Sequence, residues 1–216
     1  MIDWTKNISF KPSRIRRMPH EKQPTSPYFG IDHHDWTEVT RELLKSHPLS
    51  GPELVDAVLE SWDDIFSSRI GSGQIGVDIF PTPQIMGFLL HELIPLTLSK
   101  TNPDWRKDST KTEKDMVYIP DDSKSIEIKT SSHAGQIFGN RSYGQQSSNG
   151  SKGKSGYYCA VNFTKWDSAM RPKVGLIRFG WIDSTDWVSQ AAATGQNSTL
   201  GGLTYAHQLP VIYEDL

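Results

Sequence analysis

Three residues between positions 115 and 129 have types and spacing that could do hydrolytic chemistry. Glu127 and Lys129 belong to a Glu-Ile-Lys triplet, and eleven residues separate Glu127 from Asp115. The surrounding apolar residues predict two strands, 115–119 and 125–130, joined by a turn rich in Pro, Asp and Ser. Because side chains alternate across a strand, Glu127 and Lys129 face the same side, and antiparallel pairing can bring Asp115 beside them. Two carboxylates and an ammonium group that converge in this way outline a metal-dependent hydrolytic site.

Other acid-and-lysine combinations nearby fit this geometry less well. The Asp-Ser-Lys sequence at 122–124 has the same form as the triplet, and a Pro-Asp pair occupies 120–121. Both lie in the predicted turn, where strict alternation does not hold and side chains diverge. Strand geometry therefore favours Asp115, Glu127 and Lys129. An exposed hairpin with a Glu–Lys surface pair remains the structural alternative.

A helix before these strands carries a further acid. Thr82 is the expected N-cap, Pro83 suits the first helical position, and the helix is predicted over 84–98. The segment is apolar nearly all round, so most of its surface is expected to be buried. Glu92 shares a face with Ile85 and its neighbours, where a lone carboxylate is costly unless it is paired or metal-bound. Two roles stay open for Glu92, an active-site acid or a structural partner of an Arg or Lys.

These residues resemble the PD-(D/E)xK nuclease superfamily. In that superfamily an acid at the start of one strand meets an acid-x-lysine on the next, often with another acid from a preceding helix. The matching positions are Asp115, Glu127, Lys129 and Glu92, although a lysine rather than a proline precedes Asp115. The run 129–145 is similar to the segment that begins at the catalytic lysine in type II restriction endonucleases of the ScaI type. The resemblance implies a Mg²⁺-dependent endonuclease that cuts double-stranded DNA.

The residue types suit phosphodiester hydrolysis. Asp115 and Glu127 supply the hard oxygen ligands that Mg²⁺ prefers, and the resemblance adds the Ile128 carbonyl to the expected ligand set. A bound ion polarises the phosphate and lowers the pKa of a bound water. Lys129 is expected to orient that water or to stabilise the developing negative charge. To act as a free amine base it would need its pKa lowered considerably.

Basic and amide side chains gather in two segments. The formal net charge is −2, yet residues 1–24 carry six Lys or Arg against two acids, and residues 141–178 carry seven against one. Asn, Gln and Arg can bind base edges, while Lys suits phosphates. The predicted DNA-binding residues are Arg14, Arg16, Arg17, Ser131, Ser132, His133, Gln136, Asn140, Arg141, Gln145, Lys152 and Lys154. The alternatives are a flexible tail over 1–35 and a disordered polar loop over 131–156.

The remaining chain predicts a single α/β domain, with a mixed central sheet flanked by helices and an irregular basic arm over 1–35. Further helices are expected over 36–46 and 184–193, and another is expected to start after Ser50, with Glu53 at capping-box spacing. Further strands are expected over 77–80, 157–163, 173–182 and 209–213. Residues 100–114 are expected to form a charged link. The single cysteine, Cys159, excludes an internal disulfide and suits a reducing compartment. With neither a signal-peptide pattern nor a membrane-length apolar run, the expected location is the prokaryotic cytoplasm.

Partners and rival functions can be inferred from the same features. A restriction enzyme of this size is expected to act as a homodimer on a palindromic site, because two-fold protein symmetry mirrors operator symmetry. A separate cognate DNA methyltransferase is also expected. One alternative is a structure- or damage-specific repair or recombination nuclease of the same superfamily. Another is a DNA-binding regulatory module with an inactive nuclease fold.

Overall fold

The computed structural model describes residues 22–144, 153–167, 170–190 and 195–215. Within them, the α-helices are α1 (Trp36–Lys45), α2 (Gly51–Ser67), α3 (Pro83–Thr101) and α4 (Gly202–His207). The strands are β1 (Arg69–Ile70), β2 (Gly73–Gln74), β3 (Trp105–Lys107), β4 (Met116–Tyr118), β5 (Ile126–Ser131), β6 (Gly139–Asn140), β7 (Gly156–Phe163), β8 (Val174–Ile182), β9 (Trp187–Ser189), β10 (Asn197–Leu200) and β11 (Val211–Glu214). Short 3₁₀ helices occupy His33–Asp35 (η1), Asp122–Lys124 (η2), Arg141–Gly144 (η3) and Ser184–Asp186 (η4).

A six-stranded mixed sheet forms the centre of the fold, with strand order β11-β8-β7-β5-β4-β3. Strands β5 and β7 pair in parallel from Ile126↔Tyr157 to Ser131↔Asn162, and the other neighbours are antiparallel. The predicted strands 115–119, 125–130, 157–163 and 173–182 correspond to β4, β5, β7 and β8. The expected mixed α/β fold class is confirmed.

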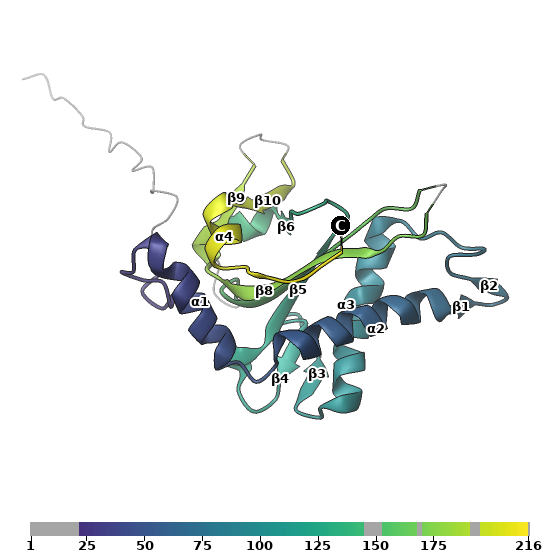
Figure 1. Cartoon of the computed structure of the whole chain (residues 1–216), viewed down its shortest axis with the longest axis horizontal. Coiled ribbons are helices and arrows are strands. Elements are labelled where there is room, and N and C mark those ends of the chain that lie inside the picture. Colours follow the sequence, from purple (N-terminus) through teal and green to yellow (C-terminus); the bar gives the residue numbers. More distant parts are fainter. Residues whose placement is uncertain (1–21, 145–152, 168–169, 191–194, 216) are drawn as a thin grey trace, which may run out of the picture.

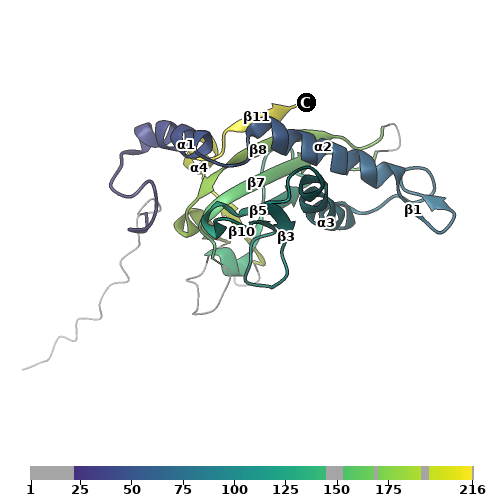
Figure 2. The ribbon, with the colours of Figure 1, turned by 90° about the horizontal axis from the view of Figure 1, so that it is seen from below.

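The two faces of the sheet carry different layers (Figure 1). Along β7, Tyr157 and Cys159 belong to the larger core, which α2 and α3 cover. Tyr158 and Ala160 point to the other face and pack with Trp187 in a smaller cluster. That second face lies beneath a three-stranded sheet of order β6-β10-β9. Figure 2 shows α2 and α3 on their side of β7 and β5. Because side chains alternate along β7, one face of the sheet packs against α2 and α3 and the other packs against the three-stranded sheet.

Helix α2 forms as its sequence predicts. Ser50 accepts a hydrogen bond from the Glu53 backbone N–H, and the Glu53 side chain accepts one from the Ser50 backbone, which completes the capping box. Leu54, Val58 and Ile65 are at most 1% exposed on the core-facing stripe. An amphipathic face and a satisfied N-terminus therefore define this helix, and the prediction is confirmed.

Helix α3 is less buried than its composition predicts. Met86, Leu90 and Ile94 face the core, whereas Ile85 is 50% and Phe88 is 59% exposed on the opposite side. The sequence is apolar nearly all round and so carries little information on helical phase. The expectation that most of this surface is buried is wrong. Thr82 is the N-cap residue as predicted, but its side chain makes no capping hydrogen bond.

Three other local predictions need correction. The helix expected over 184–193 is a single 3₁₀ turn followed by β9, because Trp187 packs in the smaller cluster and β9 pairs with β10. The strand expected over 77–80 is replaced by a preceding hairpin of β1 and β2 and an isolated bridge between Ile75 and Ile79. The charged link over 100–114 contains edge strand β3, whose Trp105 is buried.

The part of the predicted irregular arm that the structure describes, residues 22–35, consists of turns and one 3₁₀ turn, and it packs on the protein. Tyr28 is fully buried and Lys22 is 6% exposed, so residues from 22 onward pack against the body of the protein. Residues 33–35 form η1, which Asp32 caps through the His34 backbone N–H. Residues 1–21 lie outside the described part of the chain. Among the described residues, no helix combines the length and apolar character that a membrane crossing requires.

Candidate active site

Asp115 lies where β4 and β5 separate. The two strands share one register pair, Met116↔Ile126, while β5 continues to Ser131. The Asp115 Oδ2 atom accepts a hydrogen bond of 2.7 Å from the Ile128 backbone N–H, in place of a strand-to-strand contact. Because the N–H and C=O of one extended residue point to the same strand edge, the Ile128 carbonyl faces this side as well. The divergence thus brings a carboxylate and a main-chain oxygen to one edge of β5.

Glu127 and Lys129 lie on the face of β5 that carries the smaller cluster, as strand alternation predicts. The Lys129 ammonium donates a hydrogen bond of 2.6 Å to Glu127 Oε1. The Glu127 side chain is 4% exposed and that of Lys129 is 14% exposed. Glu127 and Lys129 therefore do not form the exposed surface pair that was the structural alternative. The ion pair is enclosed, so its charges are weakly screened and its geometry is well defined.

Tyr143 of η3 completes this cluster, although its role is not among the predictions from the sequence. Its hydroxyl donates a hydrogen bond of 2.7 Å to Glu127 Oε1, and the Lys129 ammonium lies 4.7 Å from the centre of its ring. Burial raises the pKa of Tyr143 far above its ordinary value, and the negative charges of Glu127 and Asp115 raise it further. Both carboxylates thus act on one phenol, which supports their convergence.

Helix α3 contributes His91 rather than Glu92 to this region. The His91 Nδ1 atom lies 3.5 Å from Asp115 Oδ2. Glu92 forms an ion pair with Lys107 of β3, and both side chains are about two-fifths exposed, at 39% and 41%. Of the two roles considered for Glu92, the structural partner of a lysine is the one that the structure contains.

A close approach between α3 and β5 places His91. A Cβ atom added to Gly87 would lie 2.6 Å from the Thr130 hydroxyl oxygen, so only glycine permits this helix-to-strand distance. His91 lies one turn later on α3. The sequence signal for this contact is the single glycine in an otherwise bulky helix, which marks a packing site.

The predicted DNA-binding residues fall into three groups. Arg14, Arg16, Arg17, Gln145 and Lys152 lie outside the described residues. Ser131, Ser132, His133 and Gln136 lie at the end of β5 and in the turn after it, and Asn140, Arg141 and Lys154 lie near η3.

The turn after β5 is built by specific hydrogen bonds. His133 Nδ1 accepts from the Gly135 and Gln136 backbone N–H groups at 3.1 Å each. The buried Asn162 amide donates to the His133 and Gln136 carbonyls at 2.8 and 2.9 Å. Gln136 itself is exposed. This turn therefore presents polar side chains at the end of the strand that carries Glu127 and Lys129.

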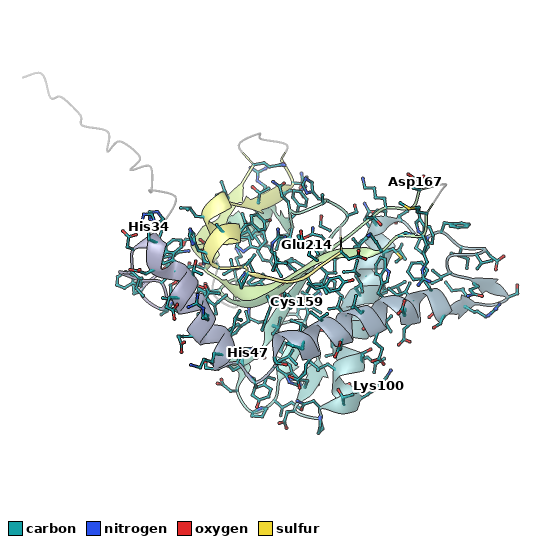
Figure 3. The ribbon with its side chains drawn as sticks, in the orientation of Figure 1. His34, His47, Lys100, Cys159, Asp167 and Glu214 are labelled. Carbon is teal, nitrogen blue, oxygen red and sulfur yellow. The ribbon has the colours of Figure 1, made fainter. Side chains whose placement is uncertain are left out.

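Two groups of side chains have the chemistry to hold a divalent ion. The Asp115 carboxylate and the Ile128 carbonyl lie at one edge of β5, and the Glu127 carboxylate lies on the adjoining face; these hard oxygen donors suit Mg²⁺ or a similar ion. Asp32, His33 and His34 form the second group, with ligand atoms within 4.8 Å of one another. His34, labelled in Figure 3, lies in η1 just before α1. Three adjacent residues do not ordinarily face one point, but the turn of η1 brings these together.

A mixed sheet that carries an acid at a strand divergence and a Glu-x-Lys on the next strand defines the PD-(D/E)xK class of nucleases. The ScaI restriction endonuclease family model matches residues 26–213. The chain is 57% identical over 196 residues to the type II restriction enzyme ScaI of Streptomyces caespitosus, and the match covers 89% of this chain and 86% of that relative. No solved structure matches.

The chain therefore belongs to the ScaI restriction endonuclease family. It is a type II restriction endonuclease, and its substrate is double-stranded DNA. Enzymes of this type generally need a divalent metal ion. The superfamily resemblance seen in the sequence is confirmed.

Proposed function

We propose that this restriction endonuclease hydrolyses phosphodiester bonds with Mg²⁺ held by Asp115, Glu127 and the Ile128 carbonyl. The observation that carries this proposal is the divergence of β4 from β5, because it places the Asp115 carboxylate against the β5 backbone beside Glu127. These are hard oxygen donors in a partly enclosed setting. When bound, Mg²⁺ would neutralise phosphoryl charge and acidify a water.

Lys129 has a separate role in this proposal. Its ammonium is enclosed beside Glu127, where a positive charge acts on a phosphoryl group more strongly than it would in bulk water. It stabilises the negative charge that develops on the phosphoryl oxygens and orients the attacking water. The resemblance to the family supports the same three residues. Glu92 is not assigned to the chemistry, because it is paired with Lys107.

The Lys129→Met variant tests this assignment on plasmid DNA with Mg²⁺. We expect cleavage to fall by about 10²-fold or more, the usual effect of removing one charge-stabilising donor. Retained DNA binding would show that the protein remains folded. The control is Lys173→Met, which removes a lysine from an exposed ion pair with Asp215 (3.0 Å) and should leave cleavage unchanged. Near wild-type cleavage by Lys129→Met would contradict the assignment.

We also propose that the polar side chains near the site bind DNA. Gln136, Asn140 and Arg141 have the donor and acceptor groups that read base edges, while Lys154 suits a phosphate. The basic residues Arg14, Arg16 and Arg17 add phosphate contacts from the N-terminal segment. Replacement of a phosphate-contacting residue should weaken binding to all sequences and reduce the salt dependence by about one unit per contact. Replacement of a base-reading residue should instead relax specificity at one position.

We further propose a homodimer that reads a palindromic site in the prokaryotic cytoplasm, with a separate cognate methyltransferase protecting the host DNA. The exposed apolar side chains Ile85, Phe88 and Leu96 on α3 support a contact with a second copy. The whole chain then acts as one nuclease domain. Sedimentation that finds a single copy on DNA would contradict the homodimer.

The identity of the DNA that is cut distinguishes restriction from repair or recombination. A restriction enzyme should give discrete plasmid fragments whose sequenced ends share one motif. A structure- or damage-specific nuclease should instead cut branched or damaged DNA and ignore intact plasmid. Binding without any cleavage under all metal conditions would support an inactive regulatory module.

A further inference from the structure

We propose that Tyr143 is a positioning residue that fixes the Glu127 carboxylate for metal binding. The inference rests on the proposed metal site and assigns a residue from outside the Asp115–Lys129 motif to it. Tyr143 donates its hydroxyl hydrogen to the same Glu127 oxygen, Oε1, that the Lys129 ammonium contacts. Two donors on one carboxylate oxygen restrict rotation of the side chain. The other oxygen, Oε2, is the one that we assign to the ion.

The Tyr143 hydroxyl is an uncharged donor to the Glu127 carboxylate. It donates to Glu127 Oε1 at 2.7 Å, on the same oxygen that the charged Lys129 ammonium contacts at 2.6 Å. A neutral donor anchors Glu127 without removing the negative charge that the ion needs.

The small sheet over the second face holds the Tyr143 ring in place. The ring packs edge-on against Trp187 of β9 at 4.9 Å between centroids. Gly139 of β6 lies directly against it, since a Cβ atom there would be 2.7 Å from Tyr143 Cγ. The Gly144 backbone N–H donates to the Ser198 hydroxyl of β10 at 3.0 Å. Elements β6, β9 and β10 thus act together as a support for one hydroxyl group.

The same short helix joins the proposed DNA-binding segment to the catalytic carboxylate. Arg141 and Tyr143 both belong to η3. The Arg141 carbonyl accepts from Ser189 Oγ at 3.2 Å, so η3 is tied to the small sheet at both of these residues. Helix η3 therefore carries both a proposed DNA-binding residue and the residue that positions Glu127.

The test uses the full-length Tyr143→Phe variant and measures Mn²⁺ binding in the absence of DNA by electron paramagnetic resonance. Loss of a hydrogen bond to a metal-binding carboxylate typically weakens metal affinity by about 10–100-fold. We expect that shift in the Mn²⁺ dissociation constant, with the KM for DNA unchanged. Tyr28→Phe is the control, because it removes a buried hydroxyl that pairs with Thr40 at 2.8 Å.

A second variant guards against a folding defect. Gly139→Ala presses on the Tyr143 ring but keeps its hydroxyl, and it should weaken Mn²⁺ binding in the same direction. Wild-type Mn²⁺ affinity in folded Tyr143→Phe, together with loss of binding in Asp115→Asn, would overturn the role of Tyr143 alone. Unchanged binding in Asp115→Asn would overturn the metal site itself, and the role of Tyr143 with it.

Discussion

Replacement of Lys22 by methionine should destabilise the protein strongly, because it leaves a buried carboxylate without its counter-charge. Lys22 forms an ion pair with Asp186, and both side chains are only 3% exposed. Its ammonium also donates to Gln208 Oε1 at 3.0 Å and lies 4.3 Å from the centre of the Trp36 ring. Methionine keeps the apolar stem and removes the charge. Asp186 would then remain buried with a net negative charge.

The magnitude can be estimated from burial. Breaking a buried ion pair by removing one partner costs about 3–5 kcal/mol. For a chain of this length each kcal/mol lowers Tm by about 2–4 °C, so the expected loss is roughly 6–20 °C. Urea denaturation and calorimetry measure the two quantities independently. Cleavage at low temperature should persist, since the pair is not among the residues of the candidate site.

An exposed ion pair provides the control for Lys22→Met. Arg41 pairs with Glu38 on α1, and the two side chains are 64% and 59% exposed. Arg41→Met should therefore cost less than about 1 kcal/mol. If Lys22→Met lowers the free energy of unfolding by no more than Arg41→Met does, the claim that burial makes the Lys22–Asp186 pair strong is refuted.

Three further predictions concern the site and the core. His91→Ala should lower cleavage by about 10-fold or more, because His91 contacts Asp115. Glu92→Gln should change cleavage little, because Glu92 pairs with Lys107. A larger loss of cleavage in Glu92→Gln than in His91→Ala would restore Glu92 as an active-site acid. His47 is buried with its pKa lowered, chiefly by desolvation, so the native state favours the neutral ring while the unfolded chain takes up a proton. Stability should therefore fall as pH drops below about 6.5, and denaturation of His47→Gln should show a flatter pH dependence. Gly180→Ala should cost about 3 kcal/mol or more, because its Cβ would lie 1.8 Å from the Gln208 carbonyl oxygen, while Gly202→Ala, with open space around it, should be near neutral in the same melts.

The catalytic strands could be predicted because their signals are local. Apolar alternation and the intervening turn specify β4 and β5, and the spacing of Glu127 and Lys129 places both side chains on one face. The α2 capping box is equally local, since all of its groups lie within one turn. Such features need no knowledge of the rest of the fold.

The role of α3 at the site could not be predicted, because it depends on helical phase. An almost uniformly apolar helix does not reveal which face meets the sheet, and the face expected to bury Glu92 is in fact exposed. The approach of Gly87 to Thr130 sets the phase and brings His91 to Asp115. That information lies in the packing of α3 against β5 rather than in either segment alone.

Tyr143 depends on contacts that are distant in sequence. Strand β6 pairs with β10 through Asn140↔Asn197, and Trp187 of β9 supports the ring. Residues 187–189 fall within the helix predicted over 184–193, but they form strand β9, which pairs with β10. Pairing between distant strands thus determines both the strand structure of β9 and the position of Tyr143.

The position of the bound divalent ion tests the proposed active site most directly. Crystals of the enzyme soaked in Mn²⁺ would reveal the ion by anomalous scattering. We predict a peak coordinated by the Asp115 and Glu127 carboxylates and the Ile128 carbonyl, and loss of that peak in Asp115→Asn. A peak at the Asp32–His34 cluster with none at Asp115 would contradict this assignment.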